Sequence, residues 1–232
     1  MNPEVARRWG RFVALKFARS LARILARRRV RKTVKTRERA IIGAQEAVLY
    51  AYRGAEKLKL NHSIAIYRVV LFLLTANRDL CVITEDILTS GNWWLRKLLA
   101  RNVALLMYEL DMSKVTGKEF RMALNYFAPP RQFSQRVESN LAALRAIHTQ
   151  LRSEFEEIRQ NTIAHRDADA IRQYRLIRNI DELTIVKRCS DFFSVAEPLV
   201  EQLVELTKTT GDMRHIVNQH IGRKLFKKKT HV

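Results

Sequence analysis

The sequence predicts an all-α protein, a multi-helix bundle of about six to eight helices with a basic amphipathic helix at its N-terminus. The chain of 232 residues has only 7 Gly and 4 Pro, too few for the turns of a β-sandwich or barrel. Apolar residues recur at helical spacing, and no segment shows the alternation of an exposed strand. Apolar residues make up 47 % and charged residues 28 %, which is typical of a folded globular chain.

Charge divides the chain into three parts. Residues 1–39 hold 14 Lys and Arg against 2 acids, whereas residues 40–222 hold 24 against 21. Residues 223–229 hold five basic groups and no acid. We therefore expect a basic N-terminal extension at 1–39, a helical bundle at 40–210, and a C-terminal helix with a basic tail at 211–232.

Residues 4–29 are predicted to form one amphipathic helix, ending in a cationic run. One face of this helix is apolar and holds Val13, Phe17, Leu21, Ile24 and Leu25. The opposite face is basic and holds Arg8, Lys16, Arg19, Arg23 and Arg27. A helix docked on the bundle, a helix lying on a membrane surface and a nucleic-acid-binding arm all fit this pattern. Cationic ends suit the phosphates of nucleic acid. The candidate contacts are Arg19, Arg23, Arg27, Arg28, Arg29, Lys227, Lys228 and Lys229.

The first half of the bundle is predicted to hold three helices. The first covers 38–60 and the third covers 93–110. The second begins at a cap, Asn61 or Ser63, and ends near Thr89. Ser90-Gly91-Asn92 separates the last two. Thr116 and Glu119 fit a capping box for the next helix, since Glu stands three residues after Thr.

Proline, serine and glycine residues predict the helix limits in the second half of the bundle. Pro129-Pro130 ends a helix, because proline lacks the amide proton and fixes its backbone. A helix then starts at about Ser134, and others follow at 168–178 and 181–196. Pro198 predicts a kink or a new first turn, and Gly211 a break. We expect the aromatic residues Trp93, Trp94, Tyr174, Phe192 and Phe193 to be core residues rather than platforms for base stacking.

The sequence lacks the residue patterns of several common kinds of functional site. Cys81 and Cys189 lie far apart with no CxxC spacing, and the six histidines form no HExxH motif. We therefore expect no metal site, no cofactor and a reducing, cytoplasmic location. The strongest apolar run, Ile64 to Ala76, is too short to span a bilayer and predicts a buried helix.

One segment stands out, Glu157-Ile158-Arg159-Gln160-Asn161-Thr162-Ile163-Ala164-His165-Arg166-Asp167. It resembles the signature of the HEPN superfamily, all-α domains that carry an Arg and a His a few residues apart. Here Gln160 follows the Arg, where the family usually has Asn. The Arg214–His220 pair has the same spacing, but it lacks the surrounding Asn, Ala, Arg and Asp. A looser resemblance covers the upstream segment from Arg101 to Glu109.

The resemblance implies a HEPN-like bundle at about 40–210 and an endoribonuclease that needs no metal. Arg159, Asn161 and His165 would be catalytic, with Gln160, Arg166, Asp167 and Glu109 in support. The resemblance also implies a homodimer that cuts single-stranded RNA to a 2′,3′-cyclic phosphate, in a bacterial defence or toxin–antitoxin system with an antitoxin partner.

The chemistry of these side chains is consistent with that reaction. His titrates near neutral pH and accepts or donates a proton, whereas Arg stays charged and binds phosphate oxygens. The alternative is a non-catalytic helical module that binds nucleic acid or a partner protein through its basic ends. In that case Arg159 pairs internally, with Glu156 or Asp167, and Asn161 and His165 cap backbone groups.

Overall fold

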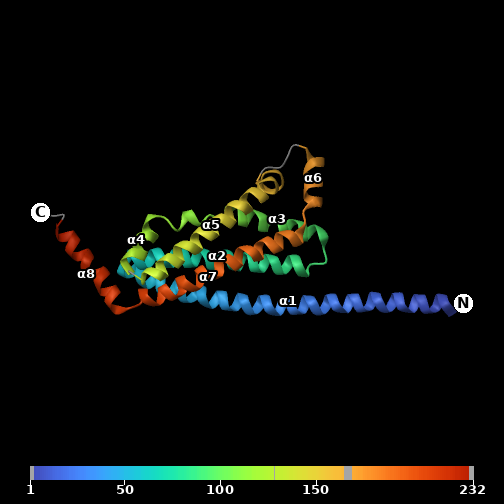
Figure 1. The fold of residues 1–232 in the computed structure, drawn as a ribbon, viewed down its shortest axis with the longest axis horizontal. Coiled ribbons are helices and arrows are strands. Elements are labelled where there is room, and N and C mark those ends of the chain that lie inside the picture. Colours follow the sequence, from blue (N-terminus) through green and yellow to red (C-terminus); the bar gives the residue numbers. More distant parts are fainter. Residues whose placement is uncertain (1–2, 128, 165–168, 230–232) are drawn as a thin grey trace.

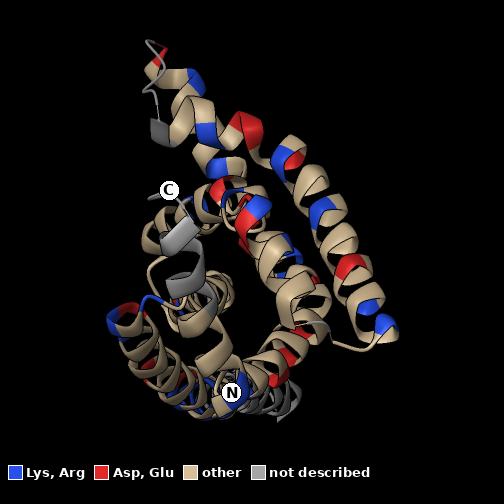
Figure 2. Cartoon of the chain, turned by 90° about the vertical axis from the view of Figure 1, so that its left-hand side faces the viewer, with Lys and Arg blue, Asp and Glu red and all other residues tan. Residues whose placement is uncertain are grey.

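The computed structural model is all-helical, as the sequence predicts (Figure 1). It describes the backbone of residues 3–127, 129–164 and 169–229, and their side chains except for 3–24, 26, 163–164 and 222–229. Within these residues there are eight α-helices, one short 3₁₀ helix, one π-helical turn and no strand. Figure 2 shows Lys, Arg, Asp and Glu interspersed over the helices of the bundle.

Helices α1 (Pro3–Leu58) and α2 (Asn61–Thr89) form an antiparallel hairpin. The turn between them is a Schellman motif: the Leu60 N–H donates to Ala55 O at 2.8 Å and the Lys59 N–H donates to Glu56 O at 3.0 Å. Lys59 takes the left-handed conformation (φ 56°) that glycine usually adopts there. The side chains of Leu60 and Ala55 are both buried, which supplies the apolar contact typical of this motif.

The hairpin has a clear register. Arg31 pairs with Glu85, and Glu38 pairs with Arg78 (Nε–Oε1 3.9 Å). Because α2 ends at Thr89, the first two dozen residues of α1 extend past it, by about 36 Å at 1.5 Å per residue. Figure 1 shows this part of α1 projecting from the bundle on the side opposite α8.

The predicted separation of two helices at 4–29 and 38–60 is wrong, because α1 runs without a break through both. The cationic run that we expected to end the first helix contains neither Gly nor Pro, so its backbone stays helical. The helix also crosses the predicted boundary at 39/40, and its ion pairs with α2 begin before it, at Arg31.

Helix α3 (Trp93–Glu109) begins at Asn92, whose Oδ1 accepts from the Trp94 and Leu95 amides at 3.0 and 3.2 Å. The two caps that the sequence predicts, at the starts of α2 and of the helix after Thr116, are wrong. The cap position of α2 is Leu60, with no side-chain hydrogen bond, and Ser63 is buried and accepts from Gln219. Thr116 donates to Met112 O at 2.8 Å instead of capping the next helix.

The 3₁₀ helix η1 (Met112–Lys114) and α4 (Lys118–Phe127) follow α3, and Pro130 is the cap position of α5 (Arg131–Arg159). Helix α5 therefore starts slightly earlier than Ser134. The π-helical turn η2 (Gln160–Ala164) extends α5 directly. Then come α6 (Ala170–Asn179), α7 (Glu182–Thr210) and α8 (Met213–Lys229), and α7 continues through Pro198.

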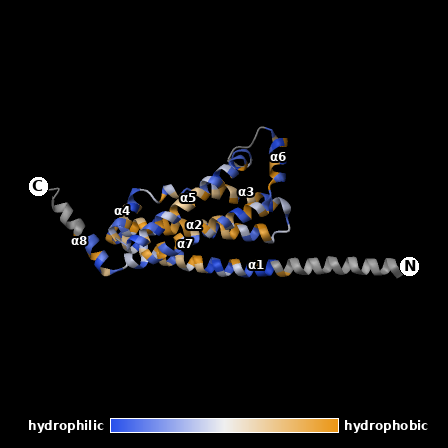
Figure 3. Cartoon of the chain, viewed as in Figure 1, coloured by the Kyte–Doolittle hydropathy of each residue, from blue (hydrophilic) through white to orange (hydrophobic). Residues whose placement is uncertain are grey.

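The core lies between α2, α3, α5 and α7, with α4 covering one end. Its largest fully buried side chains include Phe120, Phe155 and Phe192. Figure 3 shows the apolar residues concentrated along these helices, whereas the first described turns of α1 are mainly hydrophilic. The expectation that five aromatic residues belong to the core holds for Phe192, and Phe193 is partly buried against it. The expectation is wrong for Trp93, Trp94 and Tyr174, which are exposed.

Candidate functional site

The predicted motif begins where α5 ends. Arg159 is the last residue of α5, and Gln160 and Asn161 open the π-helical turn η2. His165, Arg166 and Asp167 lie outside the residues that the structure describes. The geometry of the motif is therefore given by Arg159, Gln160 and Asn161 and by what surrounds them.

Arg159 is held by the end of α3. Its Nε lies 3.3 Å from Oε1 of Glu109, and its guanidinium carbon lies 4.7 Å from the centre of the Tyr108 ring. The side chain of Arg159 is 29 % exposed and that of Glu109 is 48 % exposed. The sequence suggests Glu156 or Asp167 as internal partners, whereas the described partner of Arg159 is Glu109, one of the predicted supporting residues.

The two amides of the motif bond within their own helix. Asn161 Nδ2 donates to Glu157 O at 3.2 Å, one turn back. Gln160 Nε2 donates to Glu156 Oε1 at 3.0 Å. Both side chains thus satisfy local acceptors, which is common for such amides where a helix ends.

Helix α3 lies against the motif along its length. Arg101 Nη1 donates to the backbone oxygen of Thr162 at 3.1 Å, so the upstream segment from Arg101 to Glu109 contacts the motif at both its ends. Burial lowers the pKa of Arg101, yet a guanidinium remains charged at any physiological pH. A cavity of about 550 Å³ opens beside Arg101, between α3, η2 and α6.

The sequence did not single out two side chains on the face of α5 that meets Tyr108. His148 is buried, and its Nε2 lies 3.1 Å from Tyr108 O. The guanidinium of Arg152 lies 5.0 Å from the centre of the Tyr108 ring. His148, Arg152 and Arg159 stand at i, i+4 and i+11, a spacing that puts them on one face of a helix and would have grouped them.

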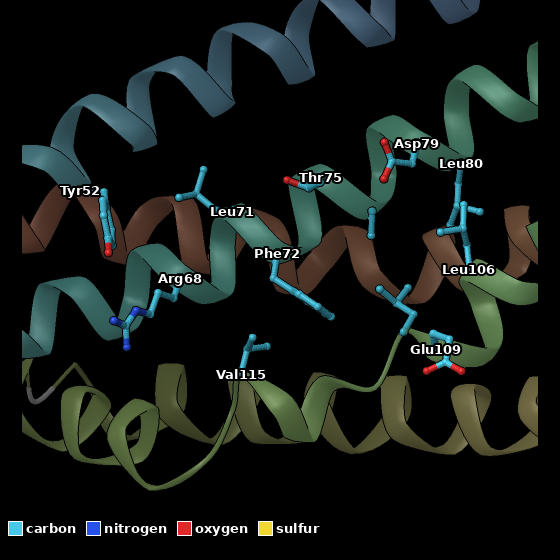
Figure 4. A pocket seen from close by; sticks show the side chains of 12 residues that line it. Tyr52, Arg68, Leu71, Phe72, Thr75, Asp79, Leu80, Leu106, Glu109 and Val115 are labelled. Carbon is cyan, nitrogen blue, oxygen red and sulfur yellow. The ribbon is translucent and has the colours of Figure 1, made fainter.

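An apolar pocket of about 580 Å³ lies on the other side of Glu109, between α2 and the segment from α3 to η1 (Figure 4). Phe72 and Val115 line its middle. Arg68 lies at one end, and Asp79 and Glu109 lie at the other. Glu109 therefore borders this pocket and also pairs with Arg159.

The predicted nucleic-acid contacts divide by location. Arg27, Arg28 and Arg29 are exposed on α1. Arg19 and Arg23 lie on the projecting part of α1, and Lys227–Lys229 form the end of α8; their side chains are outside the described set. Among the described residues no three His, Cys, Asp or Glu side chains are grouped as metal ligands, and no described helix has both the length and the apolarity needed to cross a membrane.

Comparison of the chain with protein-family models, with curated proteins and with solved structures gave no match.

Proposed function

We propose that this chain binds nucleic acid, RNA in particular, through a stripe of basic residues along α1. The stripe consists of Arg28, Lys32, Lys35 and Arg39, which stand four, three and four residues apart and so share one face of the helix. All four are exposed. This basic stripe is the observation that carries the proposal.

The stripe faces away from the bundle. The buried residues of α1, Ile41, Val48 and Ala55, lie on the opposite side of the helix, where α1 packs on α2. Within the described part of the chain, no side chain of the stripe has an ion pair or a hydrogen bond, whereas Arg31, on the side facing α2, pairs with Glu85. Four unpaired cations in a row along a rigid helix suit the regular negative charge of a nucleic-acid backbone.

Charge-reducing variants test this proposal through salt dependence. Changing all four stripe residues to Gln removes about four phosphate contacts. The slope of log Kobs against log salt for single-stranded RNA should then become shallower by about 3, at about 0.7 for each contact. A control variant loses the same charge elsewhere on the surface, with Gln at Arg121, Arg131, Arg136 and Lys208, all exposed. An equal loss of slope in both variants would refute a binding role specific to the stripe.

A second function, metal-independent cleavage of RNA at the 159–165 motif, is favoured by η2. The π-helical turn interrupts regular helix geometry at the motif itself, and such turns occur frequently at functional sites. In this proposal His165 takes the proton of the 2′-hydroxyl, and Arg159 stabilises the charge that develops on the phosphate. Homodimerisation, which would bring two Arg/His pairs to one cleft, is part of the same proposal, and sedimentation equilibrium tests it.

The second Arg/His pair of the sequence provides a matched control for cleavage. Arg159→Ala and His165→Ala should each abolish cleavage of single-stranded RNA in the presence of EDTA, with an unchanged helical circular dichroism spectrum. Arg214→Ala and His220→Ala, at the same spacing on α8, should leave cleavage intact. Cleavage that survives both motif variants, or that stops in EDTA, would refute this chemistry while leaving nucleic-acid binding by the stripe untouched.

A further inference from the structure

Three large aromatic side chains lie exposed where α3 and α6 meet. Trp93, Trp94 and Tyr174 are 46 %, 40 % and 48 % exposed. The rings of Trp94 and Tyr174 are stacked, with centroids 6.2 Å apart and 23° between their planes. A cluster of large aromatic side chains that is exposed on the surface rather than buried in the core indicates a binding site.

Trp94 and Tyr174 line the cavity of about 550 Å³ beside the motif. This volume falls in the range of about 300–1,000 Å³ that small-molecule sites occupy. Thr162 of η2 forms part of the wall, so the cavity adjoins the segment that leads to His165. The other lining residues are Leu98, Arg101, Asn102, Ala170, Gln173 and Ile177.

Arg101 gives this cavity a positive charge that no described acid neutralises. Its Nη1 donates to Thr162 O, but its Nε is buried and has no hydrogen-bond partner among the described residues. A guanidinium has five N–H donors, and those that neither are buried nor bond to Thr162 can donate to an anion in the cavity. A guanidinium binds the oxygens of a phosphate especially well.

Two carboxamides complete the lining. Gln173 Nε2 donates to Asn161 O at 3.3 Å, which leaves its Oε1 free to accept, and Asn102 has no side-chain hydrogen bond in the described part of the chain. Such groups both donate to and accept from the edge of a nucleobase. The cavity therefore combines stacked aromatic rings, amides and an unneutralised guanidinium.

We infer that this cavity binds one nucleotide unit of single-stranded RNA, with the base against Trp94 and Tyr174 and the phosphate at Arg101. The inference rests on the proposed nucleic-acid binding and adds a base-binding site to it. The basic stripe of α1 contributes charge without distinguishing bases, whereas this cavity holds a base directly. A free nucleotide has the same chemistry, and the experiment below separates the two sources.

The test measures binding of fluorescein-labelled heptauridylate to the full chain at about 0.3 M salt, where the contribution of the stripe is weak. Tyr174→Leu should weaken binding about tenfold, because the base loses one of the aromatic rings on which it stacks. Tyr50→Leu is the matched control, because Tyr50 is 82 % exposed on α1 and does not line the cavity. Arg101→Gln is a second variant, also expected to weaken binding, and thermal melts establish that each variant is folded.

Competition by uridine monophosphate identifies the source of the ligand. If the mononucleotide displaces the labelled heptamer, the cavity accepts a free nucleotide; if only unlabelled heptamer does so, the cavity needs a strand. Equal affinities of Tyr174→Leu and Tyr50→Leu would overturn the inference.

Long RNA separates this inference from the proposed function. If the stripe variant loses salt-dependent binding of a 40-nucleotide RNA while Tyr174→Leu behaves as wild type with the heptamer, the stripe stands and the cavity is refuted. If the stripe variant keeps its salt-dependent binding of the long RNA while Tyr174→Leu weakens binding of the heptamer, the cavity stands and the stripe is refuted.

Discussion

Arg159 and Glu109 join the C-terminal ends of α5 and α3 through an ion pair of 3.3 Å. The two residues are 50 positions apart in sequence. The carboxylate neutralises the guanidinium that the proposed cleavage would use, so a phosphate must compete with Glu109 for Arg159.

Removing that competitor should strengthen RNA binding. Glu109→Gln keeps the shape of the side chain and removes its charge, so we expect the affinity for single-stranded RNA at low salt to rise about two- to fivefold. The free energy of unfolding should fall by less than about 1 kcal/mol, because the pair is half-exposed. Glu119→Gln is the control, since Glu119 pairs with Arg68 away from the motif. Equal effects of both variants on RNA binding would show a response to net charge alone.

Lys59 is the position where a glycine should stabilise the protein. Its left-handed backbone conformation destabilises a residue with a side chain by roughly 1–2 kcal/mol, and Gly avoids this strain. Part of the gain is lost because Gly raises the conformational entropy of the unfolded chain. We expect Lys59→Gly to raise the free energy of unfolding by about 0.5–1 kcal/mol in urea titrations. Lys57→Gly, in the last helical turn of α1, should lower it by about 1 kcal/mol. Two changes of the same sign would contradict the Schellman geometry of this turn.

Asn92 fixes the start of α3 and with it the position of Trp94. Asn92→Ala removes the acceptor of two amides and should lower the free energy of unfolding by about 1 kcal/mol, whereas Asn92→Asp should retain most of the stability. Asn179→Ala is the control, because Asn179 is exposed and has no side-chain hydrogen bond in the described part of the chain. Chemical denaturation followed by circular dichroism measures all three variants.

The two cysteines should differ in reactivity. Burial raises the pKa of the Cys189 thiol to about 11, and it also raises that of Cys81, which is only partly buried. At pH 8 a thiol-specific reagent should modify Cys81 and leave Cys189 unmodified until the protein unfolds, because the thiolate is the reacting form. The Cys81→Ser variant should therefore show no fast reaction. A fast phase in that variant would contradict the buried position of Cys189.

The same thiol makes stability depend on pH. The pKa of Cys189 is higher in the folded chain than its ordinary value of 9.0, so the folded state holds the proton more tightly. Its contribution to stability is complete below pH 9 and is lost as pH rises toward about 11. Urea titrations across this pH window should show a decrease in the free energy of unfolding, and this decrease should be smaller in the Cys189→Ala variant.

Local sequence patterns predicted the helical class and several helix limits well. The boundaries near Asn92, Pro130 and Gly211 match the structure, because a side-chain cap, a missing amide proton and a glycine act on their own neighbours. Thr116 shows where this reasoning fails. Its hydroxyl donates to the carbonyl of Met112 and accepts from Arg145 of α5 at 3.0 Å, and sequence spacing does not contain this second contact.

The candidate sites depended on contacts that sequence spacing does not contain. Trp94 and Tyr174 are 80 residues apart and meet only because α6 packs beside α3 and η2. Glu109 was named from the motif, but its contact with Arg159 depends on the register of α3 against α5. The basic stripe, in contrast, was within reach of the sequence, since its residues follow one another at helical spacing on a single helix.

The uninterrupted course of α1 has a mechanical consequence. Because α1 has no break between the projecting segment and the part that packs on α2, the α1–α2 contact sets the direction in which its N-terminal turns leave the bundle. A change in that contact would therefore redirect the whole projecting segment.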